Sequence, residues 1–270
     1  MEDKSVMYCA GIDAGSRTIK VVVLDAESLK VAGQGLLDQG VHHDTRARQL
    51  FQSVLDAHRL RRQDVAHIIA TGYTRNGISL ADSTITEITC HATGVRHLLP
   101  EARTVVEIGG QDSKLLWLSA DGGVRDFAMN DRCAAWTGRF LEVVAGRLEA
   151  TLDSLGALAC LSRKPAAISS MCVVFAETEI IGLLSAGVPR EDIVAGVQTA
   201  IASRIASMAG SRVTPPVVFT GGVALVPGMC AALATALGCP ITPAPDPQMT
   251  GALGAAILAA RSWAMDDNEF

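Results

Sequence analysis

Two of the seven cysteines stand in contexts that favour a chemical role. Cys133 lies in NDRCAAWTGRFLE and Cys172 in ISSMCVVFAETEI, and each precedes an apolar run with helical periodicity. We expect both thiols at helix starts, where peptide dipoles favour a thiolate or an anionic cluster, with Ser169 and Ser170 as caps of the second helix. Their separation of 39 residues fits no zinc-finger or ferredoxin spacing, so two buried thiols are the alternative.

A cubane iron–sulfur cluster ordinarily takes four thiolates, and these two positions supply half of them. Two chains that meet face to face would supply all four, so the cluster would join a dimer. The other five cysteines lie in apolar or irregular segments, and we expect them to pack in the core: Cys9, Cys90, Cys160, Cys230 and Cys239.

Two glycine turns each combine a carboxylate with a lysine. GIDAGSRTIK contains Asp13 and Lys20, and VVEIGGQDSK contains Asp112 and Lys114. Turn amides bind phosphate oxygens, and an aspartate takes Mg²⁺ directly or through water. The two turns therefore predict a nucleoside triphosphate with its metal, bound between two β-hairpins. The lysines would neutralise phosphate charge, or they would be solvated strand residues.

A third glycine turn follows in PPVVFTGGVALVPGM, residues 215–229. At Gly221 and Gly222 the backbone carries no side chain, so it could admit an adenine or a ribose. The P-loop pattern GxxxxGK[ST] is missing, and neither of the first two turns opens directly into a helix, as a dinucleotide-binding fingerprint requires.

The elements that must position these residues alternate between strands and helices. Apolar and β-branched residues around the glycine turns predict hairpins over 6–25 and 104–118, a weak internal repeat about ninety residues apart. Apolar periodicity predicts helices over 140–148, 193–208 and 229–237. The closing segment TGALGAAILAARSWA predicts a helix whose small residues suit close packing against another backbone. The alternation predicts an α/β fold with a division near residue 100.

The bulk composition limits the partners. The chain has 270 residues, 49% of them hydrophobic, and a net charge of -5 with scattered Lys and Arg, which excludes nucleic acid and anionic membranes as main partners. The amino-terminal segment lacks the features of a signal peptide, and no apolar stretch is long enough to span a bilayer. We therefore expect a cytoplasmic protein with reduced thiols.

Six motifs, in this order, resemble those of one family: GIDAGSRTIK, VVEIGGQDSK, MNDRCAAWTGRFLE, ISSMCVVFAETEI, VVFTGGVA and TGALGAAILA. They are similar to the ATP-dependent activators of 2-hydroxyacyl-CoA dehydratases and to the ATPase subunits of benzoyl-CoA reductase. The resemblance implies an actin-like ATPase fold of the sugar-kinase and heat-shock-chaperone type. Two RNase H-like halves would hold the nucleotide in their cleft: residues 1–100, completed by a helix over 250–270, and residues 101–249.

The resemblance also implies the cofactors and their ligands. MgATP or MgADP would bind the chain, and a 4Fe-4S cluster shared by two subunits would be held by Cys133 and Cys172 of each. A donor such as ferredoxin would supply electrons, and larger CoA-thioester-reducing subunits would receive them. The residues implied at the nucleotide are Gly11, Asp13, Gly15, Ser16 and Lys20 in the first turn, Gly109, Gly110, Gln111 and Asp112 in the second, and Gly221 and Gly222 in the third.

Two departures from the family pattern bear on the choice between the dehydratase activators and the benzoyl-CoA reductase subunits. Trp136 replaces a glycine that usually follows CAA, and ALVP at 224–227 lacks an asparagine often found after GGVA. On this basis we predict the smaller ATPase subunit of benzoyl-CoA reductase, paired with a paralogous chain. A homodimeric dehydratase activator is the alternative.

Two further classes remain as hypotheses. A small-molecule kinase of the same fold would need a general base, for which Glu87 is the candidate alongside Asp13 and Asp112 as catalytic carboxylates. A nucleotide switch without enzymatic activity would leave Cys133 and Cys172 with no role. The six histidines show no spacing that predicts a metal site.

Overall fold

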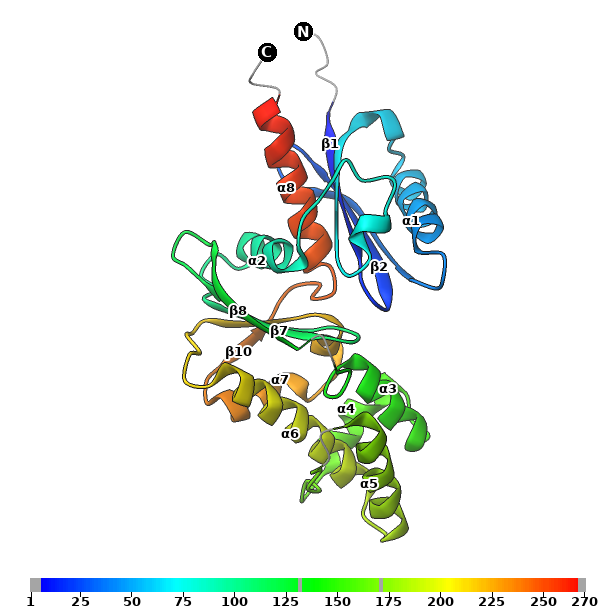
Figure 1. Ribbon diagram of the computed structural model, residues 1–270, viewed down its shortest axis with the longest axis vertical. Coiled ribbons are helices and arrows are strands. Elements are labelled where there is room, and N and C mark those ends of the chain that lie inside the picture. Colours follow the sequence, from blue (N-terminus) through cyan, green and yellow to red (C-terminus); the bar gives the residue numbers. More distant parts are fainter. Residues whose placement is uncertain (1–5, 131–132, 170–171, 267–270) are drawn as a thin grey trace. The chain divides into compact units, whose positions relative to one another are not determined.

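The computed structural model describes residues 6–130, 133–169 and 172–266, which form two compact units (Figure 1). The first unit comprises Met1–Pro100, Asp121–Val124 and Gln248–Phe270, and the second comprises Glu101–Ala120 and Arg125–Pro247. Each unit is built on its own five-stranded mixed sheet with helices. The predicted α/β class is confirmed.

The sheet of the first unit has the order β3-β2-β1-β4-β5. β1 and β2 form the predicted antiparallel hairpin, β3 continues it, and β4 and β5 add parallel strands on the other side. The strand bounds are Tyr8–Ala14 for β1, Thr18–Asp25 for β2, Val31–Asp38 for β3, Val65–Thr71 for β4 and Ser83–Thr84 for β5.

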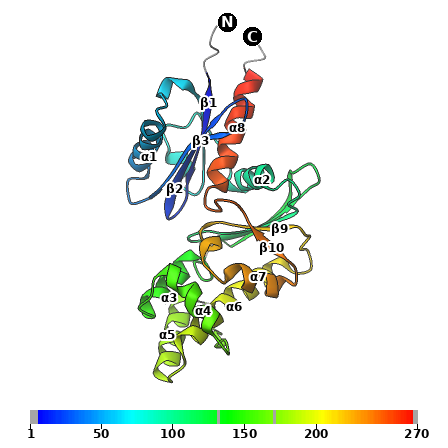
Figure 2. The same cartoon turned by 180° about the vertical axis from the view of Figure 1, so that it is seen from behind.

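Helices cover both faces of this sheet, because its central strands carry apolar residues at successive positions and bury both sides. α1 (His43–His58) packs on one face, and α2 (Glu87–Leu98) and α8 (Thr250–Asp266) lie on the other (Figures 1 and 2). Two 3₁₀ turns, Arg62–Asp64 and Arg75–Gly77, lie in the connections.

The closing helix packs backbone to backbone, as its small residues predict. A Cβ on Gly11 of β1 would collide with the carbonyl oxygen of Ala252 in α8. A Cβ on Gly94 of α2 would meet Thr250 O, and a Cβ on Gly254 would meet Cys90 O. α8 therefore approaches both β1 and α2 more closely than side chains would allow.

The sheet of the second unit has the order β10-β9-β6-β7-β8. β6 and β7 form the second predicted hairpin, and β9 lies parallel to β6 as β4 lies parallel to β1. The strand bounds are Thr104–Ile108 for β6, Ser113–Leu118 for β7, Val124–Asn130 for β8, Val217–Thr220 for β9 and Ile241–Pro243 for β10.

The structure confirms the predicted helices over 140–148, 193–208 and 229–237, but the prediction that Cys133 lies at a helix start is wrong. α6 and α7 confirm the predicted helices, whereas Cys133 lies five residues before the first residue of α3. The helix bounds are Gly138–Arg147 for α3, Leu152–Leu161 for α4, Val173–Ser185 for α5, Arg190–Ala209 for α6, Met229–Leu237 for α7 and Gly222–Leu225 for a 3₁₀ turn.

The late start of α3 has a backbone cause. Trp136 adopts φ +70°, a left-handed conformation that cannot belong to a right-handed helix, and the N-cap Thr137 is extended. Cys172 does lie at the N-cap of α5, as predicted. Ser169 is not a cap, because its amide and hydroxyl both donate to Glu179 within α5, and Ser170 lies outside the described residues.

Candidate functional site

The two glycine turns are built alike, which explains the internal repeat. Asp13 faces Lys20 across the first hairpin, and Glu107 faces Lys114 across the second. Gly15 N donates to Thr18 O at 3.1 Å, and Gly109 N donates to Asp112 O at 3.0 Å. The counterpart of Asp13 is therefore Glu107, a residue that the sequence analysis did not single out, and Asp112 lies in the turn itself.

Asp13 is buried at the first turn and held by a lysine. Asp13 is only 5% exposed, and its Oδ2 accepts a hydrogen bond from Lys20 Nζ at 3.1 Å. Lys20 is itself largely buried, so it is not a solvated strand residue. The ion pair keeps a negative oxygen and a cation together beside the turn.

The surroundings of Asp13 fit a cation and a phosphate. A Cβ on Gly72 would collide with Asp13 Oδ1, so glycine keeps the space beside that oxygen open. Thr71, which pairs with Asp13 across β1 and β4, has a buried hydroxyl with no nitrogen or oxygen partner among the described residues. The Cys90 thiol is the hydrogen-bond partner of that hydroxyl. A carboxylate beside a space that glycine keeps open suits Mg²⁺ with its water ligands.

The second turn contains a buried charge cluster. Lys114 is 3% exposed, and its Nζ donates to Glu107 Oε2 at 2.9 Å and to Asp112 Oδ2 at 2.7 Å. Burial alone would lower the pKa of Lys114, but the two carboxylates outweigh burial and raise it. Lys114 is therefore a charged partner of Asp112 and Glu107, not a solvated strand residue.

The second turn is bonded directly to the start of α3. Gly138 N donates to Gly109 O at 2.9 Å, and Arg139 N donates to Gly110 O at 2.8 Å. The buried Thr137 hydroxyl lies 3.0 Å from Gly110 O and 2.6 Å from Ala134 O, the residue after Cys133. These bonds connect the turn to the start of α3 and to the residue that follows Cys133.

The third turn is shaped by packing within the second unit. Gly221 has φ +89°, and a Cβ on it would collide with Ile108 O and approach Glu107 Oε1. Gly221 N and Thr220 Oγ1 both donate to Pro247 O. Gly222 follows as the first residue of a 3₁₀ turn.

The remaining predicted nucleotide residues lie in different surroundings. Ser16 is half-buried in the first turn, and Gln111 is exposed in the second. Gly11 lies under α8, where its lack of a side chain serves helix packing. Glu87 is the first residue of α2, and its Oε2 accepts from Arg75 Nη1 at 3.1 Å.

The cysteines differ in exposure. All seven are free thiols, Cys133 is exposed and Cys172 is half-buried. Burial raises the pKa of Cys9 to about 11 and of Cys90 to about 12, which agrees with core packing. Cys160 is exposed, so its predicted core position is wrong.

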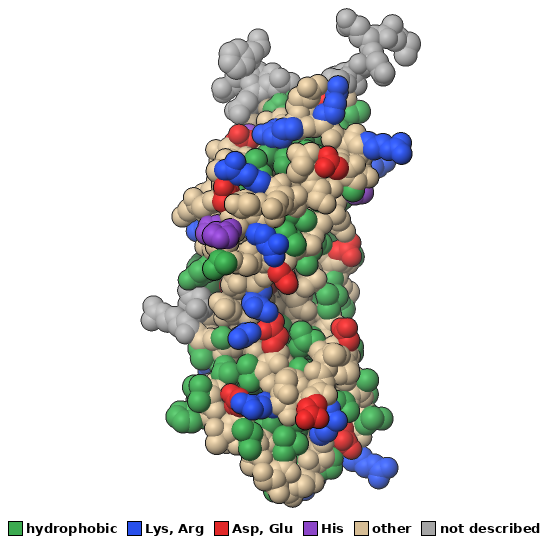
Figure 3. Space-filling model, turned by 90° about the vertical axis from the view of Figure 1, so that its right-hand side faces the viewer, with side chains coloured by type: hydrophobic (Ala, Val, Ile, Leu, Met, Phe, Trp, Pro, Cys, Tyr) green, Lys and Arg blue, Asp and Glu red, His purple; other side chains and the backbone are tan. Residues whose placement is uncertain are grey.

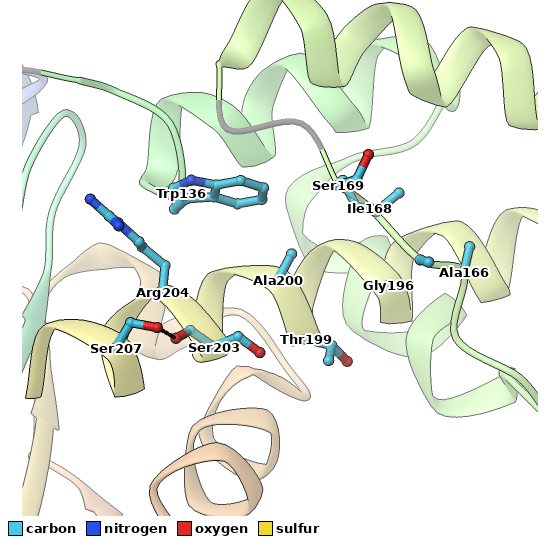
Figure 4. Close-up of a pocket in the computed structure, with 11 residues that line it drawn as sticks. Trp136, Ala166, Ile168, Ser169, Gly196, Thr199, Ala200, Ser203, Arg204 and Ser207 are labelled. Atoms are coloured by element: carbon cyan, nitrogen blue, oxygen red, sulfur yellow. Dashed lines mark hydrogen bonds between the residues drawn. The ribbon is translucent and has the colours of Figure 1, made fainter. Parts of the chain in front are cut away.

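Trp136 covers a pocket beside the Cys133 segment (Figure 4). The residue is 7% exposed, and its ring meets Phe140 edge-on at 5.1 Å. The indole lies over α6 at the side of Ala200 and Arg204, and bounds a volume of about 400 Å³. Burial of the ring holds the left-handed backbone that a glycine would adopt more easily.

Large apolar side chains are exposed on α5, the helix that has Cys172 at its N-cap. Val174, Phe175 and Ile181 are exposed, Phe175 at 68%. The face shown in Figure 3 carries patches of hydrophobic side chains among scattered acidic and basic ones. Large apolar residues that are exposed together on one helix are typical of a contact surface.

Two α/β units, each led by a glycine-turn hairpin with a buried carboxylate–lysine pair, define an actin-like ATPase. A ROK family glucokinase from Streptomyces griseus, solved with glucose and AMPPNP, shares this fold at a TM-score of 0.58 and 13% identity, covering 94% of this chain and 99% of that one. The chain belongs to the BadF/BadG/BcrA/BcrD ATPase family, whose model matches residues 10–259.

Relatives within the family differ in how similar they are to this chain. The activator of lactoyl-CoA dehydratase from Anaerotignum propionicum is 44% identical over 94% of this chain and 97% of its own length. The activator of 2-hydroxyisocaproyl-CoA dehydratase from Clostridium difficile, solved with bound ADPNP, has a TM-score of 0.92, with 38% identity over 98% of both chains.

A subunit of benzoyl-CoA reductase from Thauera aromatica is 31% identical over 93% of this chain and 92% of its own length. The predicted preference for a reductase subunit is therefore not supported, and the alternative, a dehydratase activator, fits the relatives better. The ATPase class holds for both. No helix within the described ranges is long and apolar enough to cross a membrane.

Proposed function

We propose that the chain is an ATP-dependent activator of a 2-hydroxyacyl-CoA dehydratase. Two copies would share one 4Fe-4S cluster through Cys133 and Cys172 and would pass electrons singly to the dehydratase while ATP is hydrolysed to ADP and phosphate. An external low-potential reductant would replace each electron. The similarity to two dehydratase activators supports the class of partner enzyme.

The nucleotide part of the proposal is supported by the two turns. Asp13 would take Mg²⁺ of the nucleotide directly or through water, and Lys20 would balance phosphate charge beside it. The amides of Gly110 and Gln111 would bind phosphate oxygens, while the Gly109 amide, which donates to Asp112 O, and the Asp112–Lys114 pair hold the turn in place.

The cluster part is supported by Cys172, which lies at the N-cap of α5 ahead of its exposed apolar residues, and by the exposed thiol of Cys133. Among the described residues, no group of three or more His, Cys, Asp and Glu side chains could hold a metal ion. Because a cubane cluster ordinarily takes four thiolates, Cys133 and Cys172 of two copies would together supply the full set. Such a cluster would supply a one-electron carrier when bound.

The bonds between the second turn and α3 carry the proposal. Thr137 links Gly110 O to Ala134 O, so a shift of the turn on exchange of ATP for ADP would displace the backbone next to Cys133. A nucleotide moves such an equilibrium only by binding its two states differently. Thr137 would therefore couple nucleotide state to the cluster environment.

The test replaces the Thr137 hydroxyl while keeping its shape. In anaerobically purified wild-type protein, we expect a chelator to remove iron at different rates with ADP and with a non-hydrolysable ATP analogue. The Thr137→Val variant should bind both nucleotides but show one rate. Thr235→Val, which removes an exposed hydroxyl bonded within α7, should behave as wild type. Equal rates in the wild-type protein would contradict the proposal.

A further inference from the structure

A buried histidine lies beside the carboxylate proposed to hold the metal. His91 lies on α2 and is 6% exposed, and its Nδ1 is 2.9 Å from the hydroxyl oxygen of Thr250. Thr250 is fully buried and is the first residue of α8. The contact between Nδ1 and the hydroxyl fixes the orientation of the imidazole ring, because turning the ring over would break it.

The opposite edge of the ring borders the same space as Asp13. A Cβ built on Gly251 would lie 3.2 Å from both Cε1 and Nε2 of His91 and 3.3 Å from Asp13 Oδ2. The imidazole edge and the carboxylate therefore meet at a small space that a glycine keeps open. Lys20 holds the same carboxylate oxygen at 3.1 Å.

The backbone around His91 leaves the ring little freedom. α2 and α8 touch through their main chains at two places: next to His91, where Cys90 O lies against Gly254, and one helical turn further along α2, where Gly94 lies against Thr250 O. A side chain locked by packing and by a hydrogen bond can hold a neighbouring ligand in a fixed orientation.

We infer that His91 is a positioning residue for the Asp13 carboxylate, acting through the Nε2 edge of its ring. This inference rests on the proposed function, in which Asp13 takes the metal of MgATP. Partners that orient a metal-binding group typically contribute 10–100-fold to metal affinity or activity. Loss of the Nε2 edge should therefore lower turnover and metal affinity while the fold is kept.

Two substitutions separate the two ring nitrogens. Asn places a polar atom near the position of Nδ1 and can keep the bond to Thr250, whereas Gln reaches toward the position of Nε2. In steady-state ATP hydrolysis, we expect His91→Asn to lower kcat by about tenfold or more with KM changed less than about threefold. His91→Gln should recover part of that loss.

Matched variants exclude a merely structural role. His97→Asn changes an exposed histidine on the same helix and should leave kcat unchanged. Gly251→Ala inserts a methyl group between His91 and Asp13 and should reproduce the loss of kcat. The inference would be overturned if His91→Asn kept the wild-type kcat. It would also be overturned if the variant's loss of kcat were accounted for by a lower Tm, which would indicate a loss of folded protein.

A binding measurement separates this inference from the proposed function. Mn²⁺ affinity in the presence of ADP, read by electron paramagnetic resonance, requires no turnover. We expect His91→Asn to weaken Mn²⁺ binding about tenfold, and His97→Asn to leave it unchanged. Wild-type protein that binds Mn²⁺ but hydrolyses no ATP would refute the proposed function, and unaltered Mn²⁺ binding in His91→Asn would still refute the role of His91.

Discussion

At the residue scale, the two turns depend on buried ion pairs. Lys114 forms ion pairs with both Glu107 and Asp112, and its removal leaves buried negative charge without a partner cation. Because the pKa of Lys114 is raised, its contribution to stability is complete below pH 10.5 and is lost as the pH rises through the higher folded value.

Lys114→Met should lower the free energy of unfolding by about 3–5 kcal/mol, since it leaves Glu107 buried without its cation. Urea denaturation at neutral pH measures this change. Lys30→Met, which replaces an exposed lysine, serves as the control and should change stability by less than about 0.5 kcal/mol. Equal effects of the two substitutions would contradict the role of Lys114.

The left-handed backbone at Trp136 predicts an unusual order of stability for its Gly and Ala variants. Both Trp136→Gly and Trp136→Ala lose the buried ring and should destabilise by about 3–5 kcal/mol. Because φ is +70°, the Gly variant should be the more stable of the two by about 1 kcal/mol. Thermal unfolding compares them, and an Ala variant as stable as the Gly variant would show that the left-handed backbone is not retained.

The residues that the sequence revealed are those whose partners are close in the chain. Asp13 and Lys20 face each other across one hairpin, so the turn motif was enough to find them. His91 and Thr250 are 159 residues apart, and only the crossing of α2 and α8 brings them together. Glu107 was overlooked because its role follows from strand register, although a carboxylate inside the apolar run VVEI was a usable signal.

At the element scale, α8 is fixed by glycines that allow main chains to touch. Gly254→Ala should destabilise strongly, by about 3 kcal/mol or more, because the methyl group would collide with the backbone at Cys90. Gly146→Ala on α3, where nothing lies within 4 Å, should stabilise by about 0.5–1 kcal/mol. Chemical denaturation of both variants checks the contrast, which fails if both change stability in the same direction.

The segment before Cys172 is held to α6 by Asp192. The Ser162 hydroxyl and then the amide of Lys164 donate to its carboxylate, and they hold the pKa of Asp192 below its ordinary 3.8. A lowered pKa means that this stabilisation is present above pH 3.8 and is lost as the pH falls through the folded value.

Asp192→Asn should therefore be less stable than wild type at pH 7, and the difference should shrink at pH values below the folded pKa. Denaturation over a pH series measures it, with the exposed Asp38→Asn as a control that should track wild type. A difference that stays constant with pH would show that the carboxylate charge does not hold the segment.

The start of a helix could be predicted where the apolar periodicity is strong. It could not be predicted where the backbone of a single residue interrupts the helix. α7 lies at the predicted residues, since eight of its nine residues are apolar. α3 begins after Cys133 because Trp136 is left-handed, a conformation that nothing in a run of CAAWTG with a bulky aromatic residue would indicate.

At the scale of the whole molecule, the order of six motifs identified the family, but two substitutions did not identify the branch. Trp136 lies at a position of positive φ, a conformation that favours glycine, and its ring packs against Phe140 within its own chain. Packing within one chain explains the tryptophan at position 136 without a paralogous partner. The presence of Trp136 was therefore weak evidence for a reductase subunit.

The central claim is that two copies of this chain share one cluster through Cys133 and Cys172. Native mass spectrometry of anaerobically purified protein tests it most directly. We predict a homodimer with the mass of one 4Fe-4S cluster, retained in Cys160→Ser, where an exposed cysteine is replaced, and lost in Cys133→Ser. A metal-free monomer that retains nucleotide, or a cluster that survives in Cys133→Ser, would contradict it.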